Sequence, residues 1–151
     1  MPIVIKRSTI ITDPRQLEPG PDPVFARGRP IVSAFSVANA ADDSSGSMYH
    51  LVDLPSDCSL DHVTAFQVQN WGFAAVRIGT RSSIAALVSV ARADANVHVP
   101  MAIFDARWAK PLWQQLGLSA DPRGMIGLWA HAIAGATGAG SMLCHIGYRF
   151  R

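Results

Sequence analysis

Lysine and glutamate, the side chains that usually cover exposed helices, are nearly missing from this sequence. Its 151 residues contain 2 lysines and 1 glutamate against 11 arginines and 10 aspartates, and charged residues make up 16% of the chain. Soluble domains usually carry about 25% charged residues. Because lysine and glutamate favour helices and aspartate favours turns, this composition argues against a helix-rich protein, a disordered chain and a coiled coil. We expect a surface that is largely neutral, apolar or covered by a partner.

Segments for membranes, export and nucleic acids are also missing. The longest apolar stretches are far shorter than the roughly 20 residues that span a bilayer, and no basic region precedes a sustained apolar segment at the N-terminus. We therefore expect a protein that is neither secreted nor embedded in a membrane. Basic residues are scattered singly, without the aromatic-interleaved runs of a nucleic-acid footprint. We expect no direct contact with nucleic acid.

Motifs for catalysis, metals and cofactors are missing as well. The five histidines form no H-x-H or H-E-x-x-H pattern, no G-x-S-x-G sequence occurs, and Cys58 and Cys144 lie far apart without C-x-x-C spacing. The glycine-rich residues 134–141 lack the lysine and the following helix of a phosphate-binding loop. We therefore expect no enzyme activity, no metal, no cofactor, and two reduced, buried thiols.

The first thirty residues differ from the rest in composition. They hold six of the ten prolines, and residues 13–30 show neither helical nor strand periodicity. This predicts an extended N-terminal arm over residues 1–30. Residues 3–11 are rich in isoleucine and valine, and we expect a short strand there. Such a strand pairs either with the edge of its own sheet or with the edge of a neighbour's sheet, and the sequence leaves both alternatives open.

Beyond the arm, short stretches of alternating apolar residues are separated by glycine, proline and aspartate. This pattern, without long helical segments, predicts an all-β fold over residues 31–151, an antiparallel β-sandwich of the jelly-roll type. One short helix is expected near residues 109–117, because Pro111 suits a first helical turn and Gly117 suits a helix end. Strands are expected at residues 31–37, 48–54, 60–69, 72–80, 97–103, 125–133 and 142–150.

Turn residues predict how some of these strands are connected. Residues 39–46 form a polar loop rich in aspartate and serine. Asn70-Trp71-Gly72 is expected to be a tight connection between consecutive strands, and residues 134–141 a flexible hairpin loop before the last strand. Residues 82–93 fit either a short helix or a buried strand, because periodicity does not separate the two at this length.

Several segments resemble a group of tailed-phage head proteins. They are GSMYHLVDLPSD at 46–57, VRIGT at 76–80 and KPLWQQLGLSADP at 110–122, with a closing glycine- and alanine-rich hairpin that ends in a Tyr-Arg strand. The resemblance covers residues 28–151. It implies a jelly-roll decoration or cement protein on the outer surface of the virion capsid, which bridges neighbouring copies of the major capsid protein. No catalytic residues come with it. We expect a homo-oligomer, a dimer or trimer, that assembles in the host cytoplasm.

Interface residues are expected in the N-terminal arm and among the tryptophan and arginine side chains. Both of these residue types are enriched at protein interfaces, where lysine and glutamate are depleted, and the composition has the same bias. An arm strand adds main-chain hydrogen bonds to a sheet edge. The candidate interface residues are Ile3, Val4, Ile5, Arg7, Ile10, Trp71, Trp108 and Arg77.

Two other functions are alternatives to capsid decoration. The first is a carbohydrate- or receptor-binding jelly-roll module of a phage tail or fibre, which would expose two or three tryptophans on one face. The second is a small enzyme on a β-sandwich, which would need a concave pocket that gathers histidine and aspartate. The four tryptophans are Trp71, Trp108, Trp113 and Trp129.

Overall fold

Nearly all regular structure in the described chain is β-strand. The computed structural model describes residues 2–7 and 30–150. Helix is limited there to a single turn, α2 (Leu112–Gln115), and two 3₁₀ turns, η1 (Val68–Asn70) and η2 (Arg92–Asp94). The strands are β1 (Ile5–Arg7), β2 (Ile31–Asn39), β3 (Met48–Pro55), β4 (Ser59–Leu60), β5 (Ala65–Gln67), β6 (Ala75–Gly79), β7 (Val88–Ala91), β8 (Val97–His98), β9 (Met125–His131) and β10 (Gly140–Arg149).

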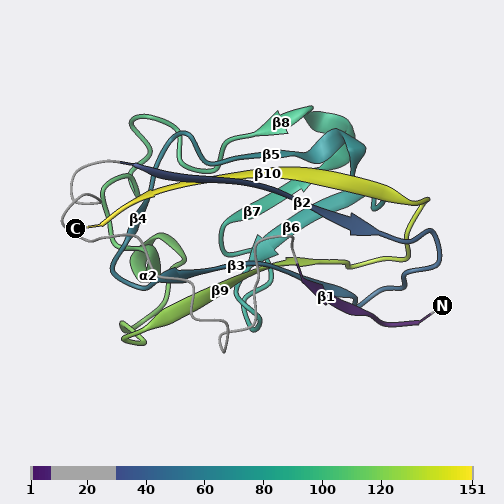
Figure 1. The fold of residues 1–151 in the computed structure, drawn as a ribbon, viewed down its shortest axis with the longest axis horizontal. Helices are drawn as coiled ribbons and strands as arrows, with labels where there is room; N and C mark the ends of the chain where they lie inside the picture. The colour runs from purple at the N-terminus through teal and green to yellow at the C-terminus, as the bar shows by residue number, and fades with distance from the viewer. Residues whose placement is uncertain (1, 8–29, 151) are drawn as a thin grey trace.

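The strands form two sheets that face each other (Figure 1). The first sheet has the order β1-β3-β9-β6-β7, and the second has the order β2-β10-β5-β8 with β4 paired to β10. Every pair is antiparallel except β1 with β3. In Figure 1, β5, β8 and β10 lie in the upper layer, and β3 and β9 lie in the lower layer. The predicted all-β sandwich is confirmed.

The core lies between the sheets and is filled from alternate strand positions. In β2, Phe35 and Val37 are buried, and the residues on either side of them are more exposed. This is the alternation that the sequence predicts, because successive side chains of a strand point to opposite faces. In β3, Leu51 and Val52 are adjacent and both buried, since the register with β9 shifts between His50 and Val52.

An aromatic cluster lies within this core. The ring centroid of Tyr49 is 5.0 Å from that of Trp71 and 6.0 Å from that of Phe73, and the last two are 5.5 Å apart. All three side chains are buried. The prediction of Trp71 as an interface residue is therefore wrong. Trp71 lies where the chain passes from one sheet to the other, and its large ring turns inward, where it removes the most apolar surface from water.

Consecutive strands mostly lie in opposite sheets. In residues 30–150 the chain crosses between the sheets from β2 to β3, from β3 to β4, from β5 to β6, from β7 to β8, from β8 to β9 and from β9 to β10. The connections at residues 70–72 and 134–141, predicted to be a tight connection and a hairpin loop, are both crossings, so the hairpin prediction is wrong. Turn residues indicate where the chain turns, but they do not determine which strands then pair. Here β9 pairs with β3 and β6, and β10 pairs with β2 and β5. All of these partners are distant in sequence.

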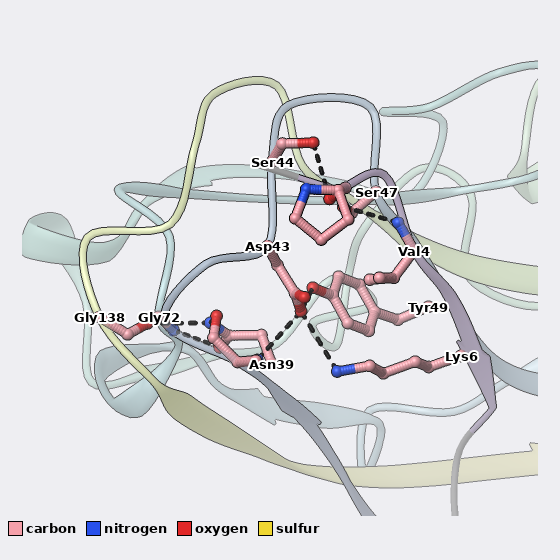
Figure 2. Close-up of polar contacts among 11 residues, drawn as sticks. Val4, Lys6, Asn39, Asp43, Ser44, Ser47, Tyr49, Gly72 and Gly138 are labelled. Atoms are coloured by element: carbon pink, nitrogen blue, oxygen red, sulfur yellow. Dashed lines mark hydrogen bonds and ion pairs between the residues drawn. The ribbon is translucent and has the colours of Figure 1, made fainter.

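These two crossings pack against each other. Asn39 donates from Nδ2 to Gly138 O at 2.9 Å and accepts at Oδ1 from Gly72 N at 3.0 Å (Figure 2). Thr137 N donates to Gly72 O at 2.8 Å. A Cβ on Gly72 would lie 2.2 Å from Asn39 Nδ2 and 2.3 Å from Gly138 O. Glycine is needed at position 72 because another backbone approaches it closely.

Several predicted elements are shorter in the structure. The strand predicted at residues 3–11 is β1, and residues 8–11 lie outside the described chain. The strand predicted at 97–103 is limited to β8, and the ambiguous segment 82–93 contains the strand β7. The helix predicted near 109–117 is the single turn α2.

Gly72→Ala is expected to lower the free energy of unfolding by about 1–3 kcal/mol, because the new methyl group overlaps Asn39 and the backbone of Gly138. Gly138→Ala is the matched control, since a Cβ there meets nothing within 4 Å. Urea unfolding measures both values. Equal stability of the two variants would contradict the close packing of the crossings.

Candidate functional site

The loop between β2 and β3 holds a buried carboxylate. The side chain of Asp43 is 2% exposed, and its Oδ2 accepts three hydrogen bonds (Figure 2). The donors are Tyr49 Oη at 2.5 Å, Ala40 N at 3.0 Å and Lys6 Nζ at 3.3 Å. Lys6 belongs to β1 and Tyr49 belongs to β3, so this carboxylate joins the N-terminal strand to the core.

Burial and hydrogen bonding have opposite effects on Asp43. Burial raises the pKa of its carboxyl group, but the hydrogen bonds from Tyr49, Ala40 N and Lys6 outweigh burial and hold the pKa below its ordinary value. For Tyr49, burial and then the bond to Asp43 both raise the pKa of the hydroxyl group. At neutral pH, Asp43 is therefore ionised, Tyr49 is protonated, and Lys6 is the cation that balances the carboxylate.

The N-terminal residues lie along the same loop and the start of β3. Pro2 O accepts hydrogen bonds from Ser44 N at 3.0 Å and from Ser44 Oγ at 2.8 Å. Val4 N donates to Ser47 Oγ at 3.2 Å, and Val4 O accepts from Met48 N at 2.9 Å. The Val4 side chain packs against the core. Polar and apolar contacts thus hold the same short segment.

We call residues 43–50 the β1 seat, because the polar contacts of residues 2–7 run to them in the described chain. Strand β1 is parallel to β3, with Ile5 opposite Met48. Of the two alternatives that the sequence left open, this structure shows the strand paired with the chain's own sheet.

The outer face of the second sheet carries almost no charge. Its strands β2, β5, β8 and β10 are all fully described. Among the Lys, Arg, Asp and Glu residues of the described chain, these four strands contain one, Arg149 at the end of β10. Arg149 Nε lies 2.6 Å from Asp61 Oδ2. Leu143, Val97 and Val32 are 57%, 51% and 49% exposed. The outward residues, which we call the neutral face, are Val32, Ala34, Ser36, Ala38, Ala65, Gln67, Val97, Ser141, Leu143 and His145.

Part of the neutral face is hollowed. A depression of about 510 Å³ lies over the middle of the four strands. Leu143 stands opposite Ser36, and His145 stands opposite Ala34 on one side and Ala65 on the other. Small side chains beside larger ones leave this hollow. It offers apolar contact and hydrogen-bonding groups, and no Lys, Arg, Asp or Glu lines it.

The outer face of the first sheet has a different character. The ring of Trp129 stacks on His50 with centroids 4.3 Å apart and 7° between the planes, and the Arg81 guanidinium lies 5.6 Å from the Trp129 ring centroid. His50 Nε2 lies 2.8 Å from Asp53 Oδ1. A Cβ on Gly127 would lie 2.9 Å from Trp129 Nε1 and 3.0 Å from Asp53 Oδ1. We call these five residues the Trp129 cluster.

Sequence reasoning missed the Trp129 cluster. In a regular strand, residues three positions apart point to opposite faces, so His50 and Asp53 carried no signal of a shared site. The register shift between His50 and Val52 puts both outward, and pairing of β3 with β9 brings Trp129 opposite His50. A β-bulge is the feature that would have predicted this arrangement.

The N-terminal candidates for an interface lie in unequal environments. Ile3 and Ile5 are 68% and 56% exposed, whereas Val4 is partly buried against the core. Arg7 is the last residue of β1. Ile10 lies outside the described residues. The exposed and buried members alternate, as expected for a strand with one face on the domain.

The other three candidates lie at separate places. Arg77 is on the outer side of β6, opposite Ser89 of β7 and His131 of β9. Trp108 is 40% exposed and lines a pocket of about 170 Å³ near the end of β10. Trp71 lies in the core. The predicted interface residues therefore do not form one surface.

Metal ligands and reactive thiols do not gather in the described chain. Within residues 2–7 and 30–150, no three His, Cys, Asp or Glu side chains are placed to hold a metal ion. Cys58 and Cys144 are free and buried, and burial raises the pKa of each thiol to about 12. Thiols of this kind are inert at neutral pH. No helix in this part of the chain is long and apolar enough to cross a membrane.

Asp43→Asn is expected to lower the free energy of unfolding by about 1–3 kcal/mol at neutral pH, because Tyr49, Ala40 N and Lys6 lose a charged acceptor. Asp42→Asn, at the exposed neighbouring position, is the matched control and is expected to leave stability nearly unchanged. Urea unfolding of the three chains measures both effects.

The same variants test the charge state of Asp43. Its pKa in the folded chain is below the ordinary value of 3.8, so its stabilisation is present above that pH and is lost as the pH falls through the folded pKa. The stability difference between the wild-type chain and Asp43→Asn should therefore shrink as the pH is lowered below 3.8. A difference that stays constant with pH would contradict an ionised Asp43.

Comparisons of this chain with family models, with curated proteins and with solved structures find no match. The neutral face, the β1 seat and the Trp129 cluster are therefore the features from which its function is inferred.

Proposed function

We propose that this chain is a structural protein of a tailed-phage virion, which decorates the outside of the capsid and bridges neighbouring major capsid proteins. It acts as a dimer or trimer and stabilises the DNA-filled head. The resemblance of residues 28–151 to phage head proteins suggests this role. The neutral face is the observation that supports it best, and it is the surface expected to meet the capsid.

The neutral face has the properties of a docking surface. Monomeric soluble proteins rarely expose large contiguous apolar patches, and here Leu143, Val97 and Val32 are about half exposed on one sheet face. Covering apolar surface is favourable by roughly 25 cal/mol per Å². No unpaired charge has to leave water, because Arg149 at the end of the face is already paired with Asp61. These properties favour broad contact with a folded partner.

The strand order supports the jelly-roll part of the proposal. Eight strands, β2, β3 and β5 to β10, divide equally between two facing sheets, and the chain crosses from sheet to sheet at six connections. Double-sheet jelly rolls have eight strands and are found in viral capsid and lectin domains. Because one architecture hosts many functions, the neutral face remains the main support for capsid decoration.

Binding alone is sufficient for the proposed role. A protein that binds only the assembled lattice shifts the equilibrium toward the lattice by mass action. An oligomer that contacts several capsid subunits forms its later contacts at high effective concentration. Apolar contact and neutral hydrogen bonds, which the neutral face offers, are the chemistry that this requires.

The Trp129 cluster favours the alternative, a carbohydrate- or receptor-binding module of a phage tail or fibre. An aromatic ring beside a few polar side chains combines apolar contact with directed hydrogen bonds. The other tryptophans do not add to this cluster, because Trp71 and Trp113 lie in or against the core and Trp108 lies near the end of β10. Sugar binding that is lost in Trp129→Ala, without binding to heads, would favour this alternative.

Purified virions are expected to contain this chain at on the order of hundreds of copies, because decoration repeats over the lattice. The purified chain should also co-sediment with expanded heads that lack it and make them more resistant to heat. Quantitative gel analysis and co-sedimentation measure these properties. A stable monomer without affinity for expanded heads would refute the proposed function.

Leu143→Asp is expected to weaken binding to heads by at least about tenfold, because it places an unpaired charge on the neutral face. Met125→Asp is the matched control, since Met125 is 61% exposed but lies on the first sheet. Circular dichroism checks that both variants fold, and co-sedimentation measures binding. Equal affinity of the two variants would contradict docking through the neutral face.

A further inference from the structure

We propose that the β1 seat accepts the N-terminal strand of a second copy of this chain, so that neighbouring copies on the capsid exchange β1. This proposal rests on the decoration function proposed above, which brings copies side by side. Three observations support it: the contacts of β1 are local, the seat is selective, and the link between β1 and β2 is long.

The contacts of β1 are local to the seat. Main-chain atoms of Pro2 and Val4 bond to the loop and to the first residue of β3, and Lys6 Nζ lies 3.3 Å from Asp43 Oδ2. These partners all belong to residues 43–50. A strand supplied by another copy therefore makes the same contacts with the same geometry, which is the condition for domain swapping at low cost.

The seat selects a strand with an apolar residue and a cation two positions apart. Val4 packs against the core and Lys6 reaches Asp43 from the same side of the strand (Figure 2), as the two-residue period of a strand requires. The Asp43 side chain is 2% exposed, and a buried carboxylate without its cation is destabilising. The N-terminus of this chain supplies the matching pattern.

The link between β1 and β2 is long enough to reach a neighbouring copy. It comprises residues 8–29, which are 22 residues outside the described chain. An extended chain spans about 3.4 Å per residue, so a link of this length spans at most about 75 Å. A domain the size of the described remainder is roughly 35 Å across. The link therefore does not confine β1 to its own sheet.

Effective concentration decides which seat β1 occupies, because exchange leaves the contacts of each seat unchanged. In a free chain, a tethered strand meets its own seat at an effective concentration of the order of mM, far above that of other copies. This agrees with the pairing of β1 in the single chain. On a capsid, the seats of neighbouring copies are held within reach of the link. Pairing of β1 with a neighbour's seat therefore competes with pairing in its own seat, and it links the copies to each other.

Two single-cysteine variants test the exchange. Ile5 and Met48 are register partners, and adjacent strands lie about 4.8 Å apart, within the range that a disulfide spans. Ile5→Cys and Met48→Cys chains are mixed equally, bound to heads and oxidised, while Cys58 and Cys144 are buried and do not compete. For complete exchange, roughly half of the chains should form a covalent dimer of the two variants, identified on a non-reducing gel and by mass spectrometry.

Two controls define the result. The same mixture in dilute solution without heads is expected to form no such dimer. Adding Lys6→Glu to the Ile5→Cys chain is expected to reduce the dimer at least about fivefold, because it places a like charge at Asp43. An undiminished dimer in that variant would overturn the selectivity of the seat.

Co-sedimentation of the same samples separates this proposal from the proposed function. Variants that bind heads without forming the covalent dimer overturn strand exchange and leave capsid decoration standing. Failure of the wild-type chain to bind heads overturns capsid decoration and, with it, exchange on the capsid. Binding together with the covalent dimer supports both.

Discussion

The packing of Tyr49 is the interaction on which the rest of this structure depends. Its ring lies in the core against Trp71 and Phe73, and its hydroxyl group bonds to Asp43. Aromatic rings bury the largest apolar areas, and a buried tyrosine hydroxyl needs a polar partner. Asp43 meets this need and also holds Lys6 of β1. One side chain thus couples the packing of the two sheets to the docking of the N-terminal strand.

The two outer faces of the sandwich differ in their polar groups. Outward positions of the second sheet hold small, apolar or neutral side chains, and its strands contain Arg149 as their one formal charge. The first sheet holds the Trp129 cluster and Arg77 on its outer side. The outward strand positions of the second sheet thus carry no Asp or Arg before Arg149, whereas the first sheet carries Asp53 and Arg77. In the proposed decoration role, this difference gives the protein one face for the capsid and another for solvent.

Elements that depend on neighbouring residues were predicted closely. Strands expected at residues 31–37 and 48–54 are β2 and β3, which extend only one or two residues further, because alternation of apolar side chains is a local property. The helix expected at 109–117 exists but is one turn long. The candidate site was predicted less well, since the partners within the β1 seat and the Trp129 cluster come from separate segments of the chain.

Local sequence was thus enough for the all-β class, the positions of strands such as β2 and β3, and the apolar and basic pattern at the N-terminus, because each depends on residues a few positions apart. The fold alone established that residues 70–72 and 134–141 cross between sheets, that Trp71 is buried, and that Lys6 meets Asp43 across 37 positions. Strands from distant segments compete for the same sheet edges, and burial selects among the pairings. A pattern of neighbouring residues does not indicate which of these pairings forms.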